Sequence, residues 1–152
     1  MLKLNIPEAT LQIKKDGGKL LVWDFLRQRW VTLTPEEWVR QHFTHWMTEQ
    51  LGYPAARLGN EISITQNGMQ RRCDSIFYDT YGKPSIIIEY KAPYIKLNEK
   101  VLDQAIRYNI VLGVPLLLIS NGMEHWSVRI EEKGTPHIKR GVPKYSEMQD
   151  SK

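Results

Sequence analysis

Three residues in the middle of the chain have the side chains that metal-assisted hydrolysis needs. Asp74 precedes the apolar pair Ile76 and Phe77, while Glu89 directly follows three isoleucines and Lys91 comes two positions later. Residues i and i+2 of a strand point to the same side, so Glu89 and Lys91 are expected to face one space. If the strand that holds Asp74 pairs with the strand that holds Glu89, two carboxylates and one ammonium group meet there.

Such a group favours hydrolysis of phosphodiester bonds. Oxygen atoms of Asp74 and Glu89 are ligands of the kind that Mg²⁺ prefers, and Mn²⁺ is expected to substitute. The cation would polarise the scissile phosphate and stabilise its developing charge. Lys91 would orient or deprotonate the attacking water, or neutralise charge at phosphorus. The alternative is an ordinary solvated ion pair at a strand edge, because Glu-x-Lys arises by chance in many domains.

The elements that must position these residues follow from the spacing of apolar and turn-forming residues. Thr34 can cap a helix, Pro35 suits its first position, and Glu37 completes a capping box, which predicts a helix from Pro35 to about Gln50. A second helix is predicted from Asn98 to Leu112, where Gly113 and Pro115 end it. Alternation and turn residues predict a hairpin over Leu20–Phe25 and Arg29–Leu33, strands over Glu61–Gln66, Arg71–Asp79, Ser85–Ala92 and Leu116–Ser120, and an edge strand over His125–Glu132.

Size and composition favour a single globular domain, and the order of the predicted elements favours an α/β or α+β sandwich with a mixed sheet. The chain has 152 residues, 41% hydrophobic and 25% charged, which suits one core, at about residues 20–132, and a polar, fraying tail at 134–152. One cysteine, Cys73, excludes an internal disulfide and a cysteine-based zinc cluster. The N-terminus lacks the pattern of a signal peptide, and the apolar stretches are too short to span a bilayer, so a cytoplasmic protein without membrane contact is expected. The net charge of +4 permits binding to a phosphate backbone without requiring it.

The segments CDSIFYD, PSIIIEYKAP and LDQAIRYNIVLGVPLLLISNG resemble the PD-(D/E)xK nuclease superfamily. More closely, they look like the nuclease domain at the N-terminus of type I restriction enzyme R subunits and its short stand-alone relatives. The resemblance covers roughly Leu20 to Trp126. It implies a restriction-endonuclease-like core, a mixed central sheet flanked by helices in the order α-β-β-β-α-β, here with an N-terminal hairpin. These residues contain no P-loop and no methyltransferase segment, so a stand-alone relative is expected rather than a complete subunit.

The resemblance also assigns roles to residues. Asp74 and Glu89 would be the metal ligands and Lys91 the catalytic lysine. Gln104 matches a glutamine that this lineage keeps near the site, on the helix after the lysine strand. An acidic residue of the first helix often joins the ligands, and Glu36 is favoured here because Glu37 is better placed for capping. Cys73 replaces the proline-type residue of the motif.

The predicted partner is DNA, although the residues do not distinguish it from RNA. Candidate contacts to the phosphate backbone would make binding salt-dependent, but they are equally typical of solvated surface. No base-reading motif is recognisable, so low sequence specificity is expected. A rival interpretation is a catalytically silent or partner-dependent binding module of a restriction or repair complex, and a homodimer and a larger assembly both remain open. The candidate contacts are Arg71, Arg72, Lys96, Lys100 and Arg107.

Overall fold

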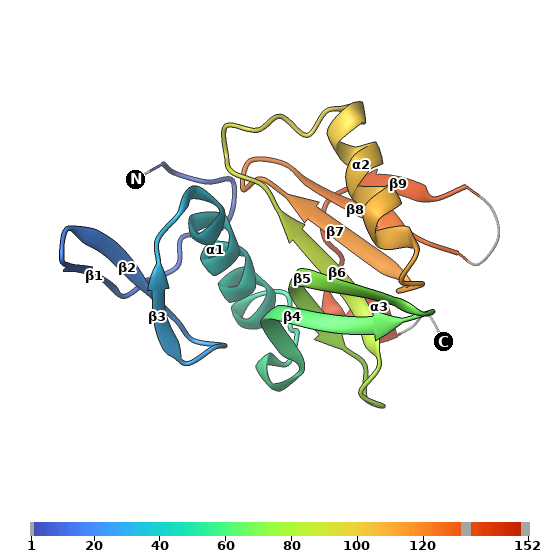
Figure 1. Ribbon diagram of the computed structural model, residues 1–152, viewed down its shortest axis with the longest axis horizontal. Coiled ribbons are helices and arrows are strands. Elements are labelled where there is room, and N and C mark those ends of the chain that lie inside the picture. The colour runs from blue at the N-terminus through green and yellow to red at the C-terminus, as the bar shows by residue number, and fades with distance from the viewer. Residues whose placement is uncertain (1, 132–134, 150–152) are drawn as a thin grey trace.

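The computed structural model describes residues 2–131 and 135–149, which form two β-sheets and the helices that pack on them (Figure 1). The strands of the small sheet come first, and the larger sheet follows after the first long helix. The elements are β1 (Ile13–Asp16), β2 (Lys19–Asp24), β3 (Arg29–Thr32), α1 (Pro35–Glu49), a 3₁₀ turn η1 (Ala55–Arg57), β4 (Leu58–Gln66), β5 (Met69–Tyr78), β6 (Pro84–Tyr90), α2 (Glu99–Ile110), β7 (Leu116–Ser120), β8 (His125–Arg129), β9 (His137–Arg140) and α3 (Tyr145–Gln149).

The larger sheet is mixed. Its strands lie in the order β4-β5-β6-β7-β8-β9, and neighbours run antiparallel except β6 and β7, which are parallel. Parallel neighbours need a crossover connection, and α2 provides it. The order α1, β4, β5, β6, α2, β7 is the predicted α-β-β-β-α-β order, so this expectation is confirmed.

Strand β6 is buried on both faces and separates two apolar cores. Ile86, Ile88 and Tyr90 pack with α1 residues such as Phe43, whereas Ile87 packs in the core that α2 covers. This period-two alternation places α1 and α2 on opposite faces of the sheet. It also directs Glu89, which lies between Ile88 and Tyr90, toward the α2 side.

The pairing of β5 with its two neighbours becomes irregular at Asp74. On one side, Asn60 pairs with Ser75 and Ile62 with Cys73, but Glu61 and Asp74 between them are not paired. On the other side, the β5–β6 register has its last pair at Ser75 and Ile88. One further step in that register places Asp74 opposite Glu89, as the sequence analysis expected. The sheet therefore opens where the candidate acids lie.

The small sheet β1-β2-β3 is antiparallel and stands beside α1, on the left of Figure 1. The predicted hairpin corresponds to β2 and β3. Strand β1 was not predicted, because all four of its residues are exposed and it lacks an apolar pattern. The sheet is tied to the rest of the protein by the buried Asp24, which accepts a hydrogen bond from Asn60 of β4.

Two expectations for the C-terminal part are wrong. Strand β8 is not an edge strand, because β9 pairs with its residues Trp126–Arg129. The region predicted to fray contains β9 and α3, and Tyr145 of α3 packs on the core that α1 covers. Glu132, the predicted end of the β8 strand, lies outside the described residues, as does part of the tail. Within residues 2–131 and 135–149, none of the helices has the length and apolar character needed to cross a bilayer.

Candidate active site

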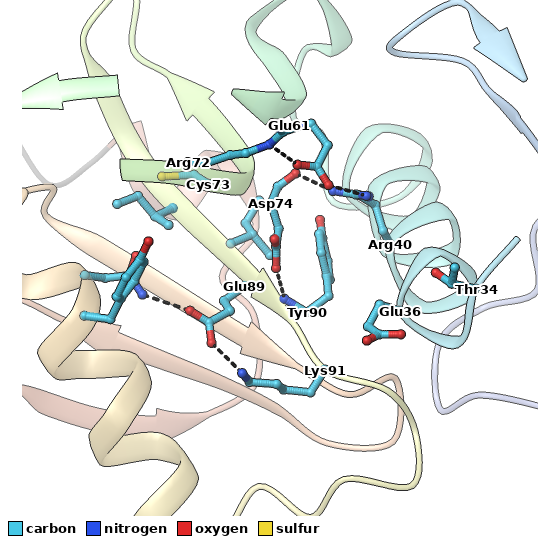
Figure 2. A pocket seen from close by; sticks show the side chains of 14 residues that line it. Thr34, Glu36, Arg40, Glu61, Arg72, Cys73, Asp74, Glu89, Tyr90 and Lys91 are labelled. Atoms are coloured by element: carbon cyan, nitrogen blue, oxygen red, sulfur yellow. Dashed lines mark hydrogen bonds and ion pairs between the residues drawn. The ribbon is translucent and has the colours of Figure 1, made fainter. Parts of the chain in front are cut away.

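The three residues singled out by the sequence analysis line one cavity of about 500 Å³. It lies where β5 and β6 separate, beside the N-terminal turn of α1, and residues from β4 and α2 complete it (Figure 2). The structure thus brings Asp74, Glu89 and Lys91 together from neighbouring strands. The full lining is Thr34, Glu36, Arg40, Glu61, Arg72, Cys73, Asp74, Ile87, Ile88, Glu89, Tyr90, Lys91, Tyr108 and Asn109.

Asp74 is held by the backbone that surrounds it. Its Oδ2 accepts a hydrogen bond of 2.9 Å from the backbone N–H of Tyr90, which substitutes for a ladder bond at the end of β6. Its own carbonyl accepts a bond of 2.8 Å from Nη1 of Arg40. Burial raises the pKa of the Asp74 carboxyl, and the nearby charge of Glu89 raises it further, whereas the Tyr90 N–H and Arg40 oppose the shift. The ionised form of Asp74 is therefore destabilised in the absence of a cation.

Glu89 lies between an amide and an ammonium group. Its Oε1 accepts a hydrogen bond of 3.0 Å from Nδ2 of Asn109, and its Oε2 lies 3.1 Å from Nζ of Lys91. Asn109 is buried on α2 and also donates to the carbonyl of Ala105 at 2.7 Å, so its orientation is fixed. Lys91 follows the last residue of β6, where its N–H donates to the carbonyl of Ser120 on β7. Sequence reasoning missed Asn109, although a polar residue on the apolar face of α2 was a usable signal.

The two acids of the first helix have different surroundings. Glu36 is exposed and lines the cavity, whereas Glu37 is buried. The Thr34 hydroxyl accepts from the N–H of Glu37 at 3.0 Å, as predicted for a cap. The Glu37 carboxylate, however, is engaged elsewhere, because it accepts from Arg27, Arg40 and Gln41. The cap at Thr34 is thus confirmed, but the predicted capping box is not formed, because the Glu37 side chain belongs to an ion-pair network instead of accepting from the N–H of Thr34.

That network centres on Arg40, which sequence reasoning did not single out. Its guanidinium donates to Glu37 at 2.7 Å and 3.0 Å, to Glu61 at 2.9 Å and to the carbonyl of Asp74 at 2.8 Å. Burial alone would lower the pKa of Arg40, but the bonds and charge of Glu37 outweigh it and raise the pKa. Arg40 therefore stays charged and fixes the irregular backbone at Asp74. A buried arginine three positions after an acid has no signature in a single sequence that separates it from a surface pair.

Burial also raises the pKa of Cys73 to about 11, and the charges of Asp74 and Glu89 contribute. The thiol is therefore protonated near neutral pH and is a poor nucleophile or metal ligand.

Several predicted residues lie outside the cavity. Gln104 is exposed on α2 and lines a separate depression with Lys100 and Arg107, so the structure does not bring it to Asp74 and Glu89. The side chains on this face of α2 point away from the sheet, which explains the difference. Lys96 is exposed in the segment before α2. Of the five candidate phosphate contacts, Arg72 lines the cavity, while Arg71 stacks over the Tyr108 ring at 4.8 Å from its centroid.

The donor set of the cavity suits a hard divalent cation held by few protein ligands. Asp74 and Glu89 offer carboxylate oxygens on adjacent strands, and Mg²⁺ typically binds one or two carboxylates and keeps several waters. A buried carboxylate whose pKa is raised is a group that a bound cation would compensate. Among the residues that the structure describes, no three His, Cys, Asp or Glu side chains gather as a metal site. Glu36 lines the same cavity as Asp74 and Glu89, and its part as a third ligand stays a prediction.

Comparisons with known proteins identify the family. The family described as type I restriction enzyme R protein N terminus matches residues 35–143. Among solved structures, a chain of the entity titled "cryoEM structure DrdV-DNA complex" is similar, with a TM-score of 0.45 and 19% sequence identity. The similarity covers 70% of this chain and 10% of that chain, so the chain spans about a tenth of the length of the solved protein. Comparison with curated proteins finds no match.

Proposed function

Because the chain belongs to the family of type I restriction enzyme R protein N termini, we propose that it is a metal-dependent nuclease that hydrolyses DNA phosphodiester bonds. The observation that carries the proposal is that Asp74, Glu89 and Lys91 line one cavity, with Nζ of Lys91 at 3.1 Å from Oε2 of Glu89. Two carboxylates and an ammonium group in a cavity rimmed by Arg40 and Arg72 suit an anionic substrate.

Each residue has a defined part in the proposed reaction. Asp74 and Glu89 would hold Mg²⁺ or Mn²⁺, and a bound cation would polarise the scissile phosphate and offset its developing negative charge. Lys91 would orient the attacking water or donate a hydrogen bond to a phosphate oxygen, since its ammonium already faces the cavity beside Glu89. Asn109 would keep Glu89 in place through its hydrogen bond to Oε1. Arg40 would preserve the backbone position of Asp74.

The test is nicking of supercoiled plasmid DNA in Mg²⁺ or Mn²⁺ by the wild-type chain and by Asp74→Asn, Glu89→Gln and Lys91→Ala. We expect each substitution to reduce nicking by about 10²-fold or more, because each removes a group that acts in the transition state. Lys83→Ala is the matched control for Lys91→Ala, since Lys83 is an exposed lysine that does not line the cavity. Addition of EDTA should abolish nicking by the wild-type chain.

Equal residual nicking by wild-type and substituted chains would refute the nuclease proposal. Salt-dependent DNA binding without any cleavage would instead support a binding module that acts with partner subunits. A parallel assay with labelled RNA distinguishes the two substrates: cleavage of RNA alone would replace DNA in the proposal.

A further inference from the structure

Glu61 lies between two arginines at the rim of the cavity. Its Oε1 accepts from Nη2 of Arg40 at 2.9 Å, and its Oε2 accepts from Nε of Arg72 at 2.8 Å (Figure 2). Each carboxylate oxygen is thus bound to a different guanidinium, which is also how two arginines bind the oxygens of a phosphodiester. All three residues line the cavity that contains Asp74 and Glu89. No motif or spacing in the sequence marks Glu61 as functional.

The backbone at Glu61 is strained. Its φ is +54°, in the left-handed region that residues other than glycine, asparagine and aspartate rarely adopt. Glu61 is also one of the two residues at which the β4–β5 pairing is interrupted. Strain of this kind persists where the surrounding structure imposes it and is frequent at functional sites. Here the two ion pairs hold the carboxylate at the cavity rim, because both arginines converge on it.

The two ion pairs of Glu61 differ in how readily they exchange. The Arg40 side chain is 9% exposed and is also bound to Glu37, whereas the Arg72 side chain is 68% exposed. An exposed ion pair contributes little to stability, since water and salt screen it. Arg40 therefore stays in place, and Arg72 is the arginine that can leave Glu61 for another anion without disturbing the fold.

We propose that Glu61 takes the place of a backbone phosphate on Arg72 in the nucleic-acid-free protein, and that Arg72 exchanges this carboxylate for a phosphodiester when DNA enters the cavity. The inference rests on the proposed function, because it takes DNA as the ligand. Glu61 then limits DNA affinity, since every DNA molecule must compete with a carboxylate that is already bound. Such competition keeps binding weak away from a committed substrate and speeds release of the cleaved product.

The experiment measures the affinity of a fluorescein-labelled duplex by anisotropy in EDTA, where cleavage is absent, over a range of salt concentrations. Glu61→Gln removes the competing charge and keeps an acceptor for Arg40. The matched control is Glu124→Gln, which removes the same charge from the exposed ion pair between Glu124 and Arg140. Neither Glu124 nor Arg140 lines the cavity. Arg72→Gln and the double variant Glu61→Gln/Arg72→Gln test whether any gain passes through Arg72.

We expect Glu61→Gln to bind DNA about two- to fivefold more tightly than Glu124→Gln at low salt, the factor that release of an exposed ion pair allows. The slope of log K against log salt should steepen by about 0.9, because one more cation becomes free to displace counterions. Both changes should vanish in the double variant. A purely structural role for Glu61 would not change this slope.

Equal affinity and slope for Glu61→Gln and Glu124→Gln would overturn the inference, as would a gain that survives Arg72→Gln. If Glu61→Gln fails to fold, Glu61→Gly provides the same test, because glycine suits the positive φ. The result is separable from that of the nicking assay. If Glu61→Gln binds DNA more tightly through Arg72 but the wild-type chain does not cleave DNA, this inference stands and the nuclease proposal is refuted. If the wild-type chain cleaves DNA but Glu61→Gln binds no more tightly, the nuclease proposal stands and this inference is refuted.

Discussion

Replacing Glu37 with glutamine tests whether the buried ion-pair network holds the site together. The Glu37 carboxylate accepts hydrogen bonds from Arg27, Arg40 and Gln41, and the Glu37 side chain is 6% exposed. Removing one partner of a buried pair leaves an uncompensated charge in a poorly solvated place. Glu36→Gln, one position earlier, is the matched control, since Glu36 is exposed.

The structure sets the size of the expected difference. Breaking a buried pair costs about 3–5 kcal/mol, and we expect the lower end because Glu61 still balances Arg40. For a domain of this size, about 3 kcal/mol lowers Tm by about 6–12 °C. Glu36 stabilises the fold through its negative charge in the first turn of α1, which contributes about 0.3–1 kcal/mol to the free energy of unfolding. Its loss should lower Tm by about 1–4 °C. The two substitutions should therefore differ several-fold in their effect on Tm.

The assay is thermal unfolding followed by circular dichroism at several pH values. Burial alone would raise the pKa of Glu37, but Arg40 outweighs this and lowers it below its ordinary value of 4.5. An acid with a lowered pKa in the folded state stabilises the fold above its unfolded pKa, and this contribution is lost as the pH falls through the folded pKa. The difference in Tm between wild type and Glu37→Gln should thus be largest at pH 7 and should decrease as the pH falls below 4.5. Equal Tm losses for Glu36→Gln and Glu37→Gln, or a gap that is constant with pH, would refute the network as described.

Four further predictions concern the cavity and the cation proposed to bind in it. Asp74→Asn should raise Tm at pH 7 without divalent cations, because burial raises the pKa of Asp74 and its charge destabilises the fold; the gain should disappear below pH 3.8, where the unfolded chain is also protonated. Mg²⁺ or Mn²⁺ should raise the Tm of the wild type but not of Asp74→Asn, and a rise in both proteins would place the cation elsewhere. Asn109→Ala should increase the cation concentration needed for half-maximal nicking by about 10- to 100-fold, because Glu89 loses its amide donor, and an unchanged requirement would contradict that role. Gln104→Ala should leave the cation-induced rise in Tm unchanged, since Gln104 does not line the cavity; a reduced rise would show that it reaches the metal.

Sequence patterns predicted the parts of the fold that are governed by local periodicity. The isoleucine run before Glu89 indicated a strand buried on both faces, and β6 has this environment. The residues Thr34 and Pro35 marked the start of α1. The spacing of Glu89 and Lys91 placed both on one side, and the turn at Gly82 allowed Asp74 to reach them. These inferences need only the two-residue period of a strand and the preferences of turns and caps.

The remainder depends on contacts between distant segments, which one sequence does not specify. Strand β9 consists of exposed residues and forms because its backbone pairs with β8, so no apolar pattern marks it. Arg40 and Glu61 are 21 positions apart and look like ordinary surface charges until the fold brings them together. Gln104 occupies the position of a glutamine that the PD-(D/E)xK nucleases resembling this chain keep near the site. The direction of its side chain, however, depends on how α2 packs on the sheet. Charged and polar positions were therefore predicted less well than apolar ones.

The polar groups packed around Asp74 explain why this part of the sheet is irregular. Asn60 and Ser75 are buried and joined at 2.6 Å, and the Ser75 hydroxyl meets the buried Tyr90 hydroxyl at 2.8 Å. Apolar side chains of similar size would fill such positions without the desolvation cost that buried polar groups carry. Only one register of β4, β5 and β6 satisfies these hydrogen bonds, because a slip of one residue would turn each side chain to the other face of the sheet. That register is the one in which Asp74 and Glu89 line one cavity and the Asp74 carbonyl accepts a hydrogen bond from Arg40. The network thus gives up some stability and, in return, fixes where the two carboxylates meet.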